Sequence, residues 1–239
     1  MEAYFKLLES YGGRDKVLRL CSFAAMAAAG NLKGESARRL LSVAGQIGEA
    51  RTVLRLYDGL PMLRRTLRLG LGSREQDVLA RLLTVLSTWS IQLFYPCEAL
   101  AWAGKHRILG VKDPGKWAGL SVATWAIFLA AQIVKSLLKI PGKWNTIEKL
   151  RKQKVLEGNS DIREQNEVLH WSLAELQHEL RTEFLSLVQN LSDLMNAVHW
   201  LPKGWLWSGK LSLGQSGLLG VISTSVMLYS SFLTPPKHK

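Results

Sequence analysis

Two long uncharged stretches dominate the hydrophobic pattern of the chain. The first runs from Trp117 to Val134 and the second from Leu211 to Pro236, and lysine flanks each stretch at both ends. A helix of about 20 residues, rising ~1.5 Å per residue, crosses the ~30 Å hydrocarbon core of a bilayer. The pattern therefore predicts two transmembrane helices, over residues 117–134 and 211–236. A buried hairpin in a soluble bundle is the alternative, because glycine and serine dilute the hydrophobicity of the second stretch.

Small residues recur at helical spacing within both predicted spans. They are Gly119, Ala123, Ala126 and Ala130 in the first span and Ser216, Gly220 and Thr224 in the second. Small side chains allow two helices to approach closely inside lipid. We therefore expect the two spans to pack on each other through these faces.

The connection between the spans, residues 135–210, contains the most regular amphipathic pattern of the chain. Apolar residues recur there at steps of three and four: Leu169, Leu173, Leu176, Leu180, Phe184, Leu187, Leu191, Leu194, Val198 and Leu201. This spacing predicts one long helix over residues 167–201 with a single apolar seam. The seam has to be covered by the N-terminal helices, by a second copy of the chain or by the membrane surface.

The N-terminal region, residues 1–116, is predicted to be helical and basic, with an amphipathic stretch over residues 50–70. The apolar side of this stretch comprises Leu54, Tyr57, Leu60, Leu63 and Leu67, and the polar side carries Arg51, Arg55, Arg64, Arg65 and Arg68. Proline interrupts helical hydrogen bonding, so Pro61 predicts two short pieces rather than one helix. A basic amphipathic helix can lie among lipid headgroups, or it can be a bundle helix with a solvated arginine face.

A third uncharged run, Leu82 to Cys97, is shorter and richer in serine and threonine. We expect a buried or interfacial helix there, ending at Pro96. Taken together, the elements predict an all-α fold: a membrane-associated helical bundle with two transmembrane helices and amphipathic helices.

The charge of the chain changes this picture only in part. The formal net charge is +12, and most of the excess lies in the first 116 residues. A basic region beside a membrane is suited to anionic lipid headgroups, although solvated helix faces would carry the same charge. The two cysteines are too few for a disulfide framework.

Candidate chemistry is sparse. Two Glu-x-x-His pairs, Glu167/His170 and Glu175/His178, fall on one predicted helix, whereas a di-metal bundle needs such pairs on two different helices. The chain has no phosphate-cradling glycine loop, no nucleophile elbow and no nucleic-acid reader motif. We therefore expect no enzyme activity, no cofactor, no metal and no nucleic-acid partner.

Four stretches of the chain resemble the peroxisomal membrane protein 11 family, most closely its gamma branch. They are ESYGGRDKVLRL (residues 9–20), RTVLRLYDGL (51–60), YPCEALAWAG (95–104) and LSDLMNAVHWLPKGWLWSGK (191–210). The stretches follow the family's order over nearly the whole chain, and the last is the most specific. Two features depart from the family: Pro61 splits the amphipathic stretch, and residues 140–166 match nothing in it.

The resemblance implies a multi-pass peroxisomal membrane protein that elongates the membrane before fission, with both termini in the cytosol. It implies homo-oligomers, hetero-oligomers with other family members, and contact with the fission machinery: fission protein 1, mitochondrial fission factor and a dynamin-related GTPase. It also favours the lipid interpretation of residues 50–70, with the five apolar residues above inserting and the five arginines holding headgroups. A small-metabolite channel and a scaffold that recruits fission proteins remain as alternatives.

Overall fold

A computed structural model of the chain describes residues 2–70, 77–157 and 163–233. These residues form helices and no β-strand. The helices are α1 (Glu2–Glu9), α2 (Tyr11–Ala29), α3 (Gly34–Arg55), α4 (Gly59–Leu69), α5 (Val78–Lys105), α6 (Pro114–Glu157), α7 (Arg163–Trp200) and α8 (Leu213–Leu233). The predicted all-α class is confirmed.

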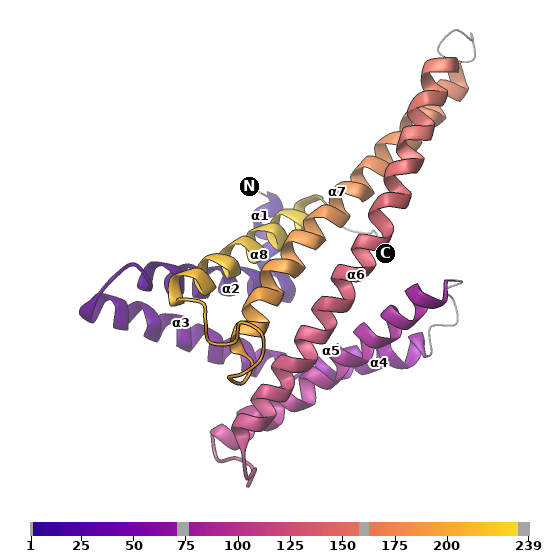
Figure 1. The fold of residues 1–239 in the computed structure, drawn as a ribbon. Helices are drawn as coiled ribbons and strands as arrows, with labels where there is room; N and C mark the ends of the chain where they lie inside the picture. The colour runs from indigo at the N-terminus through magenta and orange to yellow at the C-terminus, as the bar shows by residue number, and fades with distance from the viewer. Residues whose placement is uncertain (1, 71–76, 158–162, 234–239) are drawn as a thin grey trace.

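The two longest helices, α6 and α7, form an antiparallel pair around which the others are arranged (Figure 1). Helices α2, α3 and α8 pack on one side of the pair, and α5 with α4 packs along α6 on the other. Beyond these helices the pair continues alone as a projecting arm, which we define as residues 140–157 of α6 and 163–181 of α7. The remainder is called the bundle.

Prolines do not end helices where the sequence predicted they would. Helix α5 continues through Pro96 to Lys105, and α6 continues through Pro141, so the predicted end at Pro96 is wrong. Each proline removes one hydrogen bond, and the long contact between α5 and α6 holds the α5 axis together. Pro61 lies in the first turn of α4, where a backbone N–H has no helical partner, so the break precedes it, at residues 56–58.

The arm has a leucine-rich core. Ile147, Leu169, Leu173 and Leu180 are buried there, with Ile140, Leu150 and Leu176 packed around them. The first half of the predicted α7 seam is thus covered by the C-terminal half of α6. None of the three expected partners covers it, because α6 extends well past the uncharged stretch 117–134 and lies alongside α7.

Helices α2 and α8 approach each other closely through glycines. A Cβ at Gly30 would lie 2.4 Å from Gly214, one at Gly217 would lie 2.3 Å from the backbone of Ala27, and one at Gly220 would lie 2.2 Å from the Phe23 ring. Only glycine fits at such separations. The expected packing of segment 211–236 on segment 117–134 is therefore not what the structure shows, since α8 packs on α2 and α7; residues 234–236 lie outside the described part.

Candidate membrane-facing surface

Two helices of the described chain are long and apolar enough to cross a membrane: α5 over Val78–Lys105 and α6 over Pro114–Gln153. Helix α6 contains the stretch predicted as the first span. Helix α8, predicted as the second, does not meet this criterion, and α5 does instead. Fewer than a third of the residues in either apolar run are buried against other helices. The core helix of a soluble protein would be mostly buried.

The side chains of α5 and α6 are arranged with polar groups inside and apolar groups outside. Ser87 and Ser90 of α5 and Ser121, Thr124 and Ser136 of α6 are buried. The exposed side chains include Leu82, Leu86, Trp89 and Leu93 on α5 and Leu120, Ile127 and Val134 on α6. Water as the surrounding solvent would favour the reverse pattern, whereas hydrocarbon favours this one, because it offers no hydrogen bonds to the serine and threonine hydroxyls.

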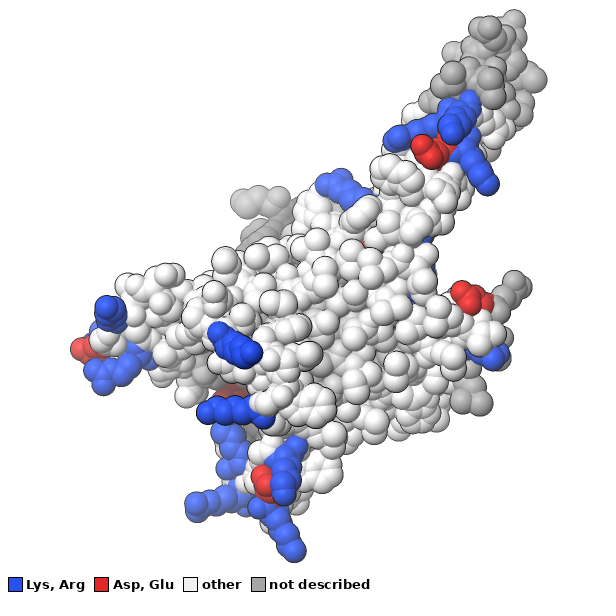
Figure 2. Space-filling model, in the orientation of Figure 1, with Lys and Arg blue, Asp and Glu red and all other residues white. Residues whose placement is uncertain are grey.

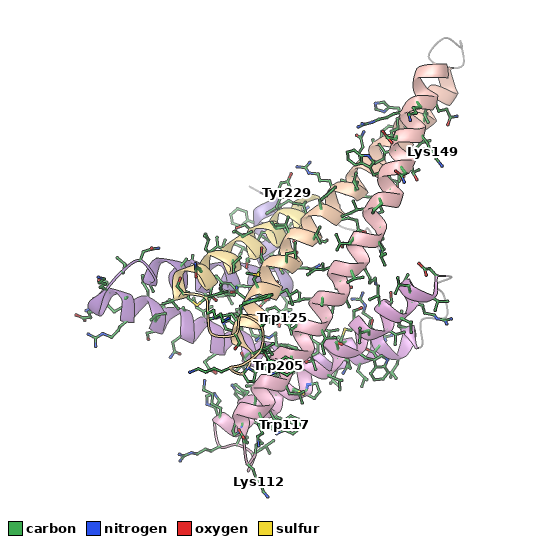
Figure 3. The ribbon with its side chains drawn as sticks, in the orientation of Figure 1. Lys112, Trp117, Trp125, Lys149, Trp205 and Tyr229 are labelled. Carbon is green, nitrogen blue, oxygen red and sulfur yellow. The ribbon has the colours of Figure 1, made fainter. Side chains whose placement is uncertain are left out.

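The distribution of charged side chains over the surface agrees with a membrane-facing bundle. Figure 2 shows a wide uncharged face over the bundle, with lysine and arginine gathered at its margins and on the arm. Lys112 and Lys149 mark the two ends of this distribution, at the α5–α6 loop and on the arm (Figure 3). The bundle therefore presents an apolar belt between two basic edges.

The interior of the bundle is polar where α2, α7 and α8 meet. Arg19 Nη2 lies 2.5 Å from Asp193 Oδ1 and donates a longer hydrogen bond of 3.3 Å to Ser223 Oγ. Asn196 donates to the carbonyl of Ser216 at 3.0 Å, and the Ser216 hydroxyl donates to Asn196 Oδ1 at 2.8 Å. Buried polar groups are stable only when paired in this way, so the network fixes how the three helices meet.

A polar cavity of about 420 Å³ opens between α6 and α7 beside this network. Its wall includes Arg19, Gln132, Glu183, Asn190 and Asp193. Glu183 accepts a hydrogen bond of 3.1 Å from Ser136 and lies 3.6 Å from Lys143. A cavity with this lining holds water or a polar group rather than hydrocarbon.

Helix α4 exposes leucine. Leu60 is 75 % exposed, Leu67 is 67 % and Leu63 is 37 %, while Thr66 on the opposite side is fully buried against α5. Tyr57 and Leu54, just before α4, are exposed as well. The five predicted inserting residues therefore all lie on the surface.

The predicted headgroup arginines divide into two groups. Arg64, Arg65 and Arg68 are exposed on α4. In contrast, Arg51 donates to Asp15 at 2.8 Å and 3.2 Å, and Arg55 donates to Glu98 at 3.0 Å and 2.6 Å. These two partly buried pairs hold α3 against α2 and α5. The two side chains are thus engaged inside the fold, which differs from the role predicted for them.

The predicted small-residue faces also occupy different places. Ser216 and Thr224 are buried, and Gly220 meets Phe23 of α2. On α6, Ala130 is exposed, and a Cβ at Gly119 would lie 3.3 Å from the Pro202 ring. On α8 the predicted small-residue face is therefore a packing face, but its partners are α2 and α7 rather than the segment 117–134.

The sequence reasoning missed Arg19, Asp193 and Asn196. Asp193 and Asn196 fall outside the apolar seam of the predicted helix 167–201, and the spacing of that seam gives no role to the residues beside it. The available signal was the scarcity of charge between Arg181 and Lys203. The ionisable residues within that segment are Glu183, Asp193 and His199. An isolated carboxylate within such a run is a candidate for pairing inside the membrane.

The all-α architecture, its candidate spans and the polar-inside arrangement define a helical membrane protein. A sequence model of one family, described as Peroxisomal biogenesis factor 11 (PEX11), matches residues 1–232. The chain belongs to this family, which is described by a role in the biogenesis of an organelle rather than by a reaction.

Two relatives are similar along nearly their whole length. Peroxisomal membrane protein 11C of Homo sapiens is 36% identical over 230 residues, which cover 94% of this chain and 91% of the relative. Peroxisomal membrane protein 11C of Mus musculus is 37% identical over 223 residues, covering 91% and 88% respectively. The gamma-type resemblance inferred from the sequence is confirmed. No solved structure matches the chain.

Proposed function

We propose that this chain is a multi-pass protein of the peroxisomal membrane that promotes membrane elongation before fission, with α4 as the inserting element. Family membership and the names of its two relatives support the organelle. The exposed leucines of α4 support the mechanism. An even number of spans places both termini on one side of the membrane, and the family resemblance assigns that side to the cytosol in this proposal.

The observation that carries the proposal is the pairing of two faces on α4. Leu60, Leu63 and Leu67 are exposed on one face, and Arg64, Arg65 and Arg68 on the neighbouring one. Fully burying an exposed leucine side chain contributes about 1.5–3 kcal/mol, and the exposed parts of these three amount to roughly two side chains, so insertion contributes on the order of 3–5 kcal/mol in one leaflet. The arginines add roughly 1 kcal/mol each near an anionic surface. Insertion into one leaflet expands that leaflet and favours curvature.

Self-association would multiply this effect over many copies. The proposal includes homo-oligomers, hetero-oligomers with other family members, and contact with fission protein 1, mitochondrial fission factor and a dynamin-related GTPase. These partners follow from the resemblance. The projecting arm, which extends away from the apolar belt, is the surface best placed to reach a soluble partner (Figure 1).

The test uses the full-length protein reconstituted into liposomes. Wild type should tubulate anionic liposomes, and Leu60→Glu with Leu67→Glu should abolish tubulation on anionic and neutral lipid alike, since it places charge in the apolar face. Arg64→Glu with Arg68→Glu should lose activity only on anionic liposomes. Arg64→Lys with Arg68→Lys is the matched control, which keeps the charge and should retain tubulation.

Imaging of peroxisomes in cells overexpressing the same variants completes the test. Elongated peroxisomes with wild type and round ones with the leucine variant support the proposal. Tubules of equal length with both proteins would show that α4 is only a bundle helix.

A second candidate is conduction of small polar metabolites, for which the polar cavity between α6 and α7 is the supporting observation. Gln132→Leu with Asn190→Leu would make its wall apolar. Solute flux into proteoliposomes that falls with this pair, while tubulation persists, would favour the channel. Unchanged flux would remove it.

A further inference from the structure

We propose that the C-terminal half of α7 and helix α8 form a hairpin that also crosses the bilayer, in addition to α5 and α6. The partner of this surface is lipid hydrocarbon. The inference concerns the path of the chain and holds whether or not α4 remodels membranes. It rests on the exposure pattern of the two helices, their length between polar ends, and the pairing of their one internal charge.

The C-terminal half of α7 is polar inside and apolar outside. Asn196 is fully buried, and Asn190, Ser192 and Asp193 are 8 %, 8 % and 3 % exposed. On the opposite side the exposed residues are Phe184, Val188, Leu191 and Met195. A helix on the surface of a water-soluble protein buries its apolar stripe. This half of α7 instead exposes apolar side chains and buries polar ones together with Ala197 and Val198, as helices in hydrocarbon do.

Helix α8 shows the same arrangement. Ser216, Ser223 and Thr224 are buried, while Leu218, Ile222 and Phe232 are exposed. The serines and glycines of α8 lie against α2 and α7. The exposed face contains Leu218, Ile222 and Phe232 and is the face left for lipid.

The polar ends of the two helices are separated by the thickness of a bilayer. From Arg181 to Trp200, and from Leu213 to Phe232, about 19 residues rise roughly 29 Å, which matches the ~30 Å hydrocarbon core. At one end, the Arg181 guanidinium lies 5.3 Å from the Tyr229 ring centroid. At the other lie Trp200 and the turn that carries Trp205, Trp207, Lys203 and Lys210.

Aromatic and basic residues at both ends are what a membrane-crossing helix carries at the two interfaces. Figure 3 places Trp205 in the turn that follows α7 and Tyr229 on α8, far from that turn. Trp207 is held in the turn by a 3.0 Å hydrogen bond from its Nε1 to the carbonyl of Met195.

The charge inside this segment is paired. Asp193 contacts Arg19 of α2 at 2.5 Å, and only 4 % of its side chain is exposed. Glu183 lies at the Arg181 end, beside Lys139 and Lys143. An unpaired carboxylate would oppose insertion of α7, and the Arg19 partner removes this obstacle.

The proposal fixes the side on which each connection lies. The arm and the C-terminus share one side, and the α5–α6 loop and the α7–α8 turn share the other. If only segments 117–134 and 211–236 crossed, the arm would lie opposite the C-terminus. If only α5 and α6 crossed, the α7–α8 turn would lie on the side of the C-terminus.

Single-cysteine labelling in sealed peroxisomes distinguishes these paths. The background is full-length protein with a C-terminal tag, Cys21→Ser and Cys97→Ala. Reporters are Lys112→Cys in the α5–α6 loop, Lys149→Cys on the arm, and Lys203→Cys in the turn, all at basic positions. A membrane-impermeant maleimide is added before or after detergent, and protease locates the tag. Lys210→Cys is a second reporter in the turn, in case Lys203→Cys fails to insert.

We expect Lys149→Cys to react from the same side as the tag, and Lys203→Cys and Lys112→Cys to react only after detergent. Labelling of the turn from the side of the tag would overturn the proposal. So would an arm that is protected while the tag is accessible. The labelling experiment does not measure tubulation. A result that overturns this membrane path would therefore say nothing about the proposed function of α4, which the liposome experiment tests.

Discussion

The two halves of the α6–α7 pair have opposite interiors. In the arm, leucine and isoleucine are buried and charged side chains are exposed. In the bundle, the same two helices bury serine, asparagine and aspartate beside apolar residues such as Leu129 and Val198, and they expose leucine, valine and methionine. The backbone geometry is continuous across the boundary. The difference is what two media would produce, water around the arm and hydrocarbon around the bundle, because the surrounding solvent decides which side chains lie inside.

Asp193→Leu should produce the largest effect, because it leaves Arg19 buried without its partner. Breaking such a pair costs about 3–5 kcal/mol. The measurement is the thermal unfolding midpoint of the purified protein in detergent micelles. Arg19→Met together with Asp193→Leu is the matched control and should recover most of the loss. A single variant as stable as wild type would show that the pair is not part of the bundle interior.

Leu173→Ala tests the interior of the arm, the second half of the α6–α7 pair. Removing a buried leucine costs about 2–5 kcal/mol, and in the projecting arm the loss should remain local. Limited proteolysis should cut the arm faster while the unfolding midpoint of the bundle changes little. Trp171→Ala is the control, since Trp171 is 74 % exposed. A fall in the bundle midpoint as large as that of Asp193→Leu would contradict independent halves.

Asn196→Leu should cost about 1–2 kcal/mol, because the Ser216 hydroxyl and carbonyl both lose their partner. The same change on the arm, Asn145→Leu, lies on an exposed face and should stay within about 0.5 kcal/mol. Detergent unfolding compares the two directly. Equal effects at both positions would remove the distinction between the interiors.

The smallest effect concerns a surface contact. Hydrogen bonding to Lys105 lowers the pKa of Glu49 below its ordinary value, and His106 adds to this at 3.3 Å. The contribution is present above the ordinary glutamate pKa and is lost as the pH falls through the lowered pKa. Because Glu49 is 37 % exposed, solvent screening limits it to less than about 1 kcal/mol. Glu49→Gln should flatten the acid limb of the stability profile slightly, and a steeper limb would contradict the assignment.

Much of the helical content could be predicted from the sequence, because apolar spacing and uncharged runs are local signals. Helix α7 begins near the predicted start and ends at Trp200, one residue before the predicted end. Helix ends at proline were less predictable. Pro96 and Pro141 lie within helices that tertiary contacts hold together, and the sequence shows no such contacts.

The membrane-facing surface was predictable in part. The leucines of α4 are exposed where their spacing placed them, but Arg51 and Arg55 pair with acids from helices distant in the chain. Asp193 and Asn196 could not be identified as interior residues, because amphipathic periodicity gives the division into faces and not which face is inside. That choice depends on the surrounding medium, which a single sequence leaves open.

The continuity of α6 has a mechanical consequence. One helix of 44 residues joins the apolar belt to the arm, so a tilt of its lower half rotates the arm through the same angle. The arm is roughly 30 Å long at 1.5 Å per residue, and a tilt of about 10° moves its tip by about 5 Å. Pro141 stands at the joint, where one helical hydrogen bond is missing, and any bending there would reduce the rotation that reaches the arm. A small change in the tilt of α6 inside the apolar belt would thus be amplified at the outer end of the arm.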